Sequence, residues 1–412
     1  MLSVKNPIMT GFFPDPSICR VGNKFYTVHS TFAYFPGVPV FESEDLVHWN
    51  LISNVLDRDS QVPLSGCQHS QGIFAPTIRY HKGTWYMITT NVSDQGNFIV
   101  TAKDPRGPWS EPYYLGESTG GIDPSLFFDD DGTCYYIGQR PRSAGYRYNG
   151  DCEIWIQTLD LDTMQLKPDA TIVLTGFQRK AIWPEGPHLY KKDGYYYILH
   201  AESGTSIHHS VMIARSKNVF GPYEYCPCNP ILTHRHLGAQ YPVTCVGHAD
   251  LVDDGNGNWY MVVLACRPNQ GYTLLGRETF LAKVTWEDGW PVVNAGVGHL
   301  EEVVTLPYEG QPSDDVPQCK TYTFDTPSLP LELLTLRNHR DHELELHAEE
   351  HIVRLFHRCD SLKDCGEPAY LALRQQHWNC EFETSFIPHF CKESDCAGIA
   401  MVQSNENHLR AE

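Results

Sequence analysis

The sequence contains five copies of one short pattern, and this repetition limits the folds that the chain can adopt. Each copy begins with a polar or small residue, often followed by proline. An apolar strand, a Gly or Asn turn and a strand rich in aromatic residues come next. The copies begin 60, 48, 62 and 63 residues apart, at Asp15, Ala75, Asp123, Glu185 and His248. Units of this length with about four strands each are typical of propeller blades. We therefore predict an all-β chain whose residues 1–307 form a five-bladed β-propeller.

Composition agrees with many short strands and limits the partners. Aromatic residues make up 12% of the chain, and 32 Gly and 28 Pro interrupt it with turns. The net charge of −19 opposes binding to nucleic-acid phosphates and anionic membranes. The sequence shows neither a long apolar run nor a secretion signal. We therefore expect a cytoplasmic protein with no nucleic-acid or membrane partner.

The fourteen cysteines are spread along the chain without a repeating spacing. Disulfide scaffolds are shorter and much denser in cysteine, so we expect free and mostly buried thiols. The tight pair in Cys226-Pro227-Cys228 lacks a second pair or histidines at zinc-site spacing. The sequence therefore predicts no metal site at this pair.

Three acidic residues occupy repeat starts. In a propeller the first strand of each blade lies next to the central axis, so that the starts of these strands converge at one end of the channel. Asp15, Asp123 and Glu185 belong to blades one, three and four, and His248 belongs to blade five. A single Asp before Pro usually caps a turn. Three acids at one point of a repeat instead indicate a shared catalytic pocket.

Five motifs in the chain occur in the order of a known enzyme family. They are Phe13-Pro14-Asp15-Pro16-Ser17, Ser30-Thr31-Phe32, Gly121-Ile122-Asp123-Pro124-Ser125, Trp183-Pro184-Glu185-Gly186-Pro187 and Leu275-Gly276-Arg277-Glu278-Thr279-Phe280. Together they resemble glycoside hydrolase family 43, most closely its β-xylosidase and α-L-arabinofuranosidase branch. The resemblance covers nearly the whole chain and implies a five-bladed propeller followed by a β-sandwich.

The resemblance implies a role for each acid. Asp15 matches the general base that deprotonates water, and Glu185 matches the general acid. Asp123 matches a third carboxylate that orients the acid and raises its pKa through a nearby negative charge. The family inverts configuration, so we expect the carboxyl groups of Asp15 and Glu185 to lie roughly 6.5 to 9.5 Å apart, with room for the water.

Neighbouring residues are expected to bind the sugar. Phe32 and Phe74 lie just beyond axial strands, where aromatic rings cover the hydrophobic face of a pentose. Many relatives have Trp where this chain has Phe74, which leaves the shape of the subsite open. Arg277 resembles the family's substrate-binding arginine, and a salt bridge to Glu278 or another acid is the alternative.

His248 is also expected to face the channel as part of the substrate site. In some relatives the corresponding histidine lies beneath the sugar, near a divalent ion or an ordered water. Ca²⁺ prefers oxygen ligands, and a lone histidine is more often a hydrogen-bonded core residue. We therefore expect that no cofactor is required, with Ca²⁺ near His248 as the alternative.

The composition of the sequence changes after the predicted propeller. Residues 308–318 read as a linker rich in Pro, Gly and Asp, and residues 319–412 read as a β-sandwich that is short for the family and incomplete. Strand-like segments occur at 331–333, 344–346 and 382–386, and the segment 398–403 has no evident partner. An incomplete sandwich exposes strand edges, so association with a second copy is left open.

The sequence therefore predicts an exo-acting, inverting β-xylosidase that releases xylose from xylo-oligosaccharides in xylan degradation. α-L-Arabinofuranosidase activity stays open, because two pentoses present similar hydroxyl geometry to one shallow pocket. A non-catalytic carbohydrate-binding propeller is the alternative from another class, and it has no need of three converging acids. A fructosidase is disfavoured, since its Asn-Asp-Pro-Asn type of signature is missing.

Overall fold

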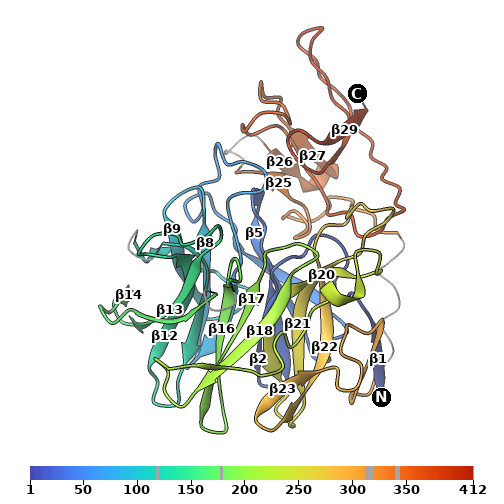
Figure 1. Ribbon diagram of the computed structural model, residues 1–412. Helices are drawn as coiled ribbons and strands as arrows, with labels where there is room; N and C mark the ends of the chain where they lie inside the picture. Colours follow the sequence, from blue (N-terminus) through green and yellow to red (C-terminus); the bar gives the residue numbers. More distant parts are fainter. Residues whose placement is uncertain (117–119, 177–179, 311–318, 339–343, 412) are drawn as a thin grey trace.

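The computed structural model describes residues 1–116, 120–176, 180–310, 319–338 and 344–411, and Figure 1 shows them as a chain built almost entirely of strands. Within these ranges the helical elements are two short 3₁₀ turns, η2 (Arg235–Leu237) and η3 (Ala348–Glu350). No helix in the described part is long and apolar enough to cross a membrane. The predicted linker, residues 308–318, lies largely outside the described residues.

Five antiparallel sheets form the propeller, and within each one consecutive strands pair outward from the axis. Blades one and two consist of β2 (Ser17–Val21), β3 (Lys24–Val28), β5 (Gly37–Ser43) and β6 (Asn50–Leu56), then β7 (Thr77–His81), β8 (Thr84–Asn91), β9 (Gly96–Ala102) and β10 (Tyr113–Tyr114). Blade three consists of β11 (Ile122–Phe128), β12 (Cys134–Pro141), β13 (Cys152–Asp160), β14 (Gln165–Leu166) and β15 (Thr171–Thr175). Blades four and five consist of β16 (Glu185–Lys192), β17 (Tyr195–Glu202), β18 (Ser210–Ser216) and β19 (Glu224–Tyr225), then β20 (Thr244–Asp253), β21 (Trp259–Cys266), β22 (Glu278–Glu287) and β23 (Trp290–Val293).

The predicted five-bladed propeller is confirmed. The innermost strands β2, β7, β11, β16 and β20 contact one another in a closed ring. One apolar cluster joins Ile18 and Phe25 of blade one to Tyr260 and Leu281 of blade five. Next to this cluster, β1 (Leu2–Lys5) pairs with β24 (Val303–Leu306), which ties the start of the chain to the end of the propeller. Ring closure therefore rests on apolar packing between the first and last blades.

The backbone shows where the repeats align. Asp15, Asp123, Gly186 and His248 all have positive φ, between 50° and 59°, at the start of their inner strands. Gly186 is therefore the equivalent position in blade four, and the prediction that this copy starts at Glu185 was wrong by one residue. Strand register shifts at these points in blades three, four and five. Such bulges redirect side chains. In blade four the bulge brings Glu185, which precedes the repeat position, to the channel mouth.

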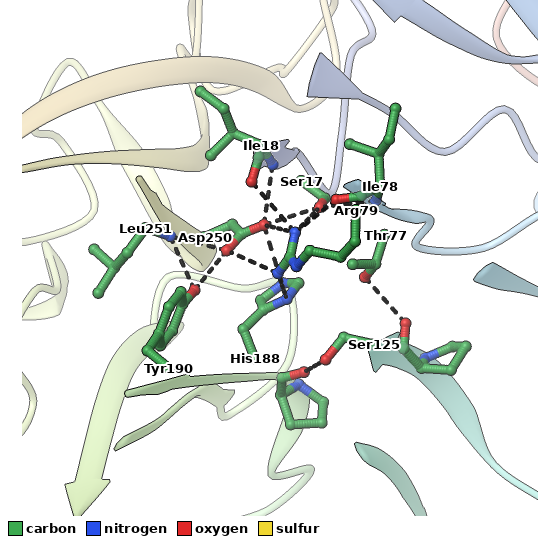
Figure 2. Close-up of polar contacts among 12 residues, drawn as sticks. Ser17, Ile18, Thr77, Ile78, Arg79, Ser125, His188, Tyr190, Asp250 and Leu251 are labelled. Carbon is green, nitrogen blue, oxygen red and sulfur yellow. Dashed lines mark hydrogen bonds and ion pairs between the residues drawn. The ribbon is translucent and has the colours of Figure 1, made fainter. Parts of the chain in front are cut away.

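A buried polar network fills the channel between the innermost strands, as Figure 2 shows. Arg79 lies with Nη1 3.1 Å from Oδ2 of Asp250, and its Nη2 lies 3.1 Å from Nδ1 of His188. The hydroxyl groups of Ser17 and Tyr190 donate to Asp250 at 2.8 and 2.5 Å. Asp250 is fully buried. The network thus links blades one, two, four and five around one ion pair.

Blade three joins this network through hydroxyl groups. Ser125 Oγ donates to the carbonyl oxygen of Pro187 at 2.7 Å, and Thr77 Oγ1 donates to that of Pro124 at 3.0 Å (Figure 2). Buried polar groups are costly unless they are hydrogen-bonded. Satisfied partners across neighbouring blades therefore fix the relative positions of the inner strands beneath the channel mouth.

Part of the C-terminal region packs directly on the propeller. β25 (Thr335–Leu336) pairs with β4 (Tyr34–Phe35), which lies in the loop between β3 and β5. The fully buried side chain of Arg337 donates to the carbonyl oxygens of Cys67 and Gly366 at 2.6 and 2.7 Å. These contacts anchor the segment beside blades one and two.

Two hairpins account for most of the remaining strands, β26 (Leu344–His347) with β27 (Ile352–Leu355) and β28 (Ile399–Val402) with β29 (His408–Ala411). The strand predicted at 344–346 is confirmed. The strands predicted at 331–333 and 382–386 are wrong, since these segments form a turn and irregular, exposed chain. The segment 398–403 does have a partner, β29. All fourteen cysteines are free thiols as expected, but seven of them are exposed, so the expectation of mostly buried thiols was wrong.

Candidate active site

The three predicted catalytic acids lie together at the mouth of the channel. Asp15 and Asp123 are 5% and 6% exposed, and Glu185 is half-buried. The backbone N–H of Gly186, next to Glu185, donates to Oδ2 of Asp123 at 3.1 Å and so joins blades three and four. The charges of Asp15 and Glu185 both act on Asp123. The structure therefore brings the acids of three blades into one electrostatic group.

Asp15 is held as a carboxylate by its neighbours. Arg277 Nη1 donates to its Oδ1 at 2.8 Å, and Ser30 Oγ donates to its Oδ2 at 2.6 Å. His248 Nδ1 lies 3.8 Å from Oδ1. Burial alone would raise the pKa of Asp15, but Arg277, His248 and Ser30 together lower it below its ordinary value. Asp15 is therefore ionised at neutral pH, as a base must be.

Glu185 and Asp123 are shifted in the opposite direction. Burial, followed by the negative charge of Asp15, raises the pKa of Glu185 to about 7, although Arg277 opposes the shift. Burial and the charges of Glu185 and Asp15 raise the pKa of Asp123 well above its ordinary value. We expected Asp123 to be the charge that raises the pKa of Glu185. Asp15 takes that part instead, because Arg277 keeps it ionised while the two other acids compete for a proton.

Glycine is required at two positions that shape the site. Gly186 has φ 59°, and a Cβ there would lie 3.0 Å from Cε1 of His248. Gly72 has φ 91°, and a Cβ there would lie 2.4 Å from the carbonyl oxygen of Phe32. Only glycine allows both the left-handed backbone and the close approach. These residues therefore set how closely Phe32 and His248 approach the neighbouring backbone.

The predicted sugar-binding residues gather beside Asp15. The rings of Phe32 and Phe74 meet edge to face with centroids 5.4 Å apart. The guanidinium of Arg277 lies 5.2 Å from the centroid of Phe32. Phe32 bridges to Ile73 through two backbone hydrogen bonds, which fix it next to the start of blade two. The structure thus brings Phe32, Phe74, Arg277 and His248 together, and their roles in binding stay predictions.

The alternative for Arg277, a salt bridge to Glu278 or another acid, is met by another acid. Glu278 pairs with Arg267, whose Nε lies 2.6 Å from Oε2. Arg277 does form a salt bridge, but with Asp15. Its side chain therefore belongs to the acid group.

Sequence reasoning missed three residues near Asp15. Phe12 stacks on Phe32 with centroids 5.6 Å apart, and Ser30 hydrogen-bonds Asp15. Ser30 begins one of the recognised motifs and Phe12 directly precedes another, so their positions carried a signal. His209 is buried behind the site, where burial lowers its pKa to about 3. It lies in a loop before β18, where the repeat gives no signal.

Two family models match the chain in succession. The model for glycosyl hydrolases family 43 matches residues 4–291. The chain belongs to glycosyl hydrolase family 43. A second model, the β-xylosidase C-terminal concanavalin A-like domain, matches residues 321–412 and agrees with the predicted sandwich class.

Several family 43 proteins are similar over nearly the whole chain. A xylosidase/arabinosidase from Butyrivibrio fibrisolvens is 55% identical over 99% of this chain and 79% of its own length. A non-reducing end α-L-arabinofuranosidase from Bacteroides ovatus is 40% identical over 98% of this chain and 74% of its own. The crystal structure of a xylan β-1,4-xylosidase from Bacillus halodurans has a TM-score of 0.82 at 38% identity, covering 91% of this chain and 72% of that one.

A Ca²⁺ ion near His248 does not fit the residues of this family 43 chain. Both oxygens of Asp15 already have partners, and the cation of Arg277 lies beside them. Deeper in the channel the guanidinium of Arg79 occupies the place next to Asp250. In the described ranges no group of three or more His, Cys, Asp and Glu side chains is placed to hold a metal ion. Hard cations need several oxygen ligands, which this site does not offer.

The geometry gives this family 43 site the elements of acid–base glycoside hydrolysis. Asp15 is ionised, while the pKa of Glu185 near 7 leaves a large protonated fraction at neutral pH. Cleavage of a glycosidic bond needs one group that gives a proton to the leaving oxygen and one that takes a proton from water. The chain is therefore a glycosidase whose channel mouth holds one carboxyl group ionised and another largely protonated.

Proposed function

We propose that this glycosidase is an exo-acting, inverting β-xylosidase that releases xylose from the non-reducing end of xylo-oligosaccharides. One observation carries the proposal: neighbouring carboxyl groups at the same channel mouth have pKa values shifted in opposite directions. The xylosidase names of the relatives support the choice of pentose.

In this mechanism Asp15 takes a proton from a water molecule that attacks the anomeric carbon. Glu185 gives its proton to the departing sugar oxygen. Asp123 positions Glu185 through its hydrogen bond with the backbone of Gly186. Inversion requires the carboxyl groups of base and acid to lie roughly 6.5 to 9.5 Å apart, so that the water fits between the base and the sugar.

The sugar at the cleavage point lies, in this proposal, over the rings of Phe32 and Phe74. Apolar ring faces match the C–H face of a pentose. Arg277 donates to a sugar hydroxyl while it keeps its contact with Asp15, so that substrate binding and ionisation of the base depend on one cation.

Initial-rate assays with p-nitrophenyl β-xyloside and p-nitrophenyl α-L-arabinofuranoside test the activity and the pentose preference together. The xyloside is expected to be the better substrate. Proton NMR during the first turnovers of xylobiose is expected to show α-xylose first. Absence of turnover on both aryl glycosides would overturn the activity, and β-xylose as the first product would overturn inversion.

We also propose that the reaction needs no bound metal, because Arg277 and Arg79 supply the positive charge at the mouth and in the channel. A non-catalytic binding propeller is not favoured, since binding alone has no use for carboxyl groups held in different protonation states. The cytoplasmic location, the domain boundaries at 307 and 318 and association with a second copy stay predictions.

A further inference from the structure

A cavity of about 1270 Å³ lies beside the catalytic acids, between blades two and three. One wall is the β8–β9 hairpin, residues 90–97, and the other is the loop between β12 and β13, with Tyr146 and Tyr148. Ile122 and Trp183 also line it. These residues lie one and two positions before Asp123 and Glu185. The cavity therefore adjoins the acid group on the side of blades three and four.

Trp183 is fixed as an aromatic surface of this cavity. Its backbone N–H donates to the carbonyl oxygen of Gly150 at 2.8 Å, and its φ of 48° is unusual for a bulky residue. A Cβ on Gly204 would lie 2.8 Å from its ring, and one on Gly150 would lie 3.1 Å from Nε1. The residue is nevertheless 38% exposed. Strained backbone held by close packing is common at ligand sites, where it presents a side chain in a defined position.

Gln139 belongs to the wall of the same cavity, but its amide oxygen is closed to a ligand. It lines the cavity, is only 4% exposed, and its Oε1 has no hydrogen-bond partner among the described residues. A buried amide oxygen without a partner costs free energy, and native proteins rarely leave one unsatisfied. Because this oxygen has almost no accessible surface, a ligand in the cavity contacts Trp183 and not Oε1 of Gln139.

The direction of the reaction assigns this cavity to one part of the substrate, and this step rests on the proposed function. Glu185 gives its proton to the leaving oxygen, so the leaving group lies on its side of the cleaved bond. Phe32 and Arg277, which hold the sugar to be released, lie beside Asp15 on the side of blades one and five. Trp183 lies two residues before Glu185 in the chain and therefore belongs to the side of the acid.

We propose that this cavity binds the leaving-group portion of a pentose oligosaccharide beyond the first sugar after the cleaved bond. A sugar ring stacks on the exposed face of Trp183. Aromatic surfaces combined with amide groups suit a neutral polyhydroxylated chain, which has apolar ring faces and many hydroxyl donors. The preferred substrates are therefore oligosaccharides of three or more units.

Chain-length kinetics test the proposal. The ratio of kcat/KM for xylotetraose to kcat/KM for xylobiose cancels damage to the acid group itself, because both substrates have a sugar leaving group that needs the proton. Trp183→Ala is expected to lower this ratio about fivefold or more, as expected for the loss of one stacked ring. Tyr80→Ala removes an exposed aromatic residue in β7 that is absent from the cavity lining, and is expected to leave the ratio unchanged.

In the unmodified protein kcat/KM is expected to rise from xylobiose to xylotetraose. A flat dependence, or variants that lower xylobiose and xylotetraose hydrolysis equally, would overturn the cavity assignment while leaving the xylosidase activity standing. Calorimetry on the full chain carrying Glu185→Gln separates the two claims. Tighter binding of xylotetraose than of xylobiose, lost on adding Trp183→Ala, supports the cavity even if turnover fails; equal affinities overturn it.

Discussion

Arg277 donates to Oδ1 of Asp15 at 2.8 Å, and its positive charge acts to lower the pKa values of both Asp15 and Glu185. Burial, in contrast, acts to raise the pKa of both acids. Asp15 receives the closer contact together with Ser30, so its pKa is lowered, whereas Glu185 faces the resulting negative charge and its pKa rises. One arginine therefore helps to hold two chemically similar carboxyl groups in different protonation states, which are the states that the proposed base and acid need.

Replacing Arg277 should move the pH dependence of the reaction. In the unmodified protein kcat/KM is expected to fall as the pH rises through about 7, where Glu185 loses its proton. The acid limb lies below the ordinary range, since the pKa of Asp15 is lowered. Arg277→Met removes the cation that favours both carboxylates, so both limbs shift to higher pH. Rates on an aryl xyloside between about pH 4 and pH 9 measure this.

The conservative variant separates charge from shape. Arg277→Lys keeps the charge, so its limbs should lie between those of the unmodified protein and Arg277→Met. A lower rate with unmoved limbs in both variants would assign Arg277 to substrate binding alone.

Glu185→Gln should reveal the acid through its leaving groups. Loss of a general acid typically lowers the rate about 10² to 10⁴-fold. The loss is expected to be large with xylobiose and much smaller with p-nitrophenyl xyloside, because nitrophenolate leaves without prior protonation. Comparing kcat on both substrates checks this. Asp130→Asn, which changes an exposed acid, is the control and should leave both rates unchanged. Equal losses on the two substrates would remove Glu185 from the acid role.

The repeat made the propeller and the meeting of the acids predictable, because a blade is one unit repeated around an axis. Asp15, Asp123 and His248 stand at equivalent positions and share positive φ. Glu185 lies one residue earlier, and the bulge that turns it toward the others is a matter of backbone register. The sequence carried a signal for this shift, because the apolar residue of the strand, Leu189, comes four residues after Glu185, whereas it comes three residues after the other repeat starts.

Contacts between distant segments could not be predicted. Trp183 lies in a recognised motif, but its role depends on Gly150 and Gly204, which the repeat does not relate to it. Strand-like alternation at 382–386 gave a wrong prediction, because a strand also needs a partner and that segment has none in the described structure. Local pattern identifies candidates for strands, and tertiary contacts decide among them.

Substitutions at two glycines separate the effect of backbone strain from the effect of side-chain crowding. Gly186→Ala introduces a Cβ 3.0 Å from the ring of His248 and beside Glu185, whereas Gly194→Ala, at φ 75°, meets open space. Both variants bear the cost of a left-handed backbone, about 1 to 3 kcal/mol of unfolding free energy. Only Gly186→Ala is expected to lower kcat, because His248 or Glu185 must move. Urea unfolding and initial rates measure the two effects. Equal kcat in the two variants would contradict the tight packing at Gly186.

The ion pair between Arg79 and Asp250 in the channel is expected to stabilise the fold. Burial alone would raise the pKa of Asp250, but Arg79, His188 and Tyr190 lower it to about 2. Arg79→Met leaves that charge buried without its cation and should lower the unfolding free energy by about 3 to 5 kcal/mol. Arg58→Met, which removes an exposed pair, is the control and should cost less than about 1 kcal/mol. Urea unfolding at neutral pH measures both.

The same ion pair predicts how stability and activity respond to pH and metals. A lowered carboxyl pKa stabilises the folded chain above the unfolded pKa of about 3.9, and the contribution disappears as the pH falls toward 2. The stability difference between Asp250→Asn and the unmodified protein should therefore shrink over that range.

Since Arg79 already supplies the channel cation, EDTA and added Ca²⁺ should leave kcat unchanged. Activity lost in EDTA and restored by Ca²⁺ would show that a metal, and not this guanidinium, completes the channel.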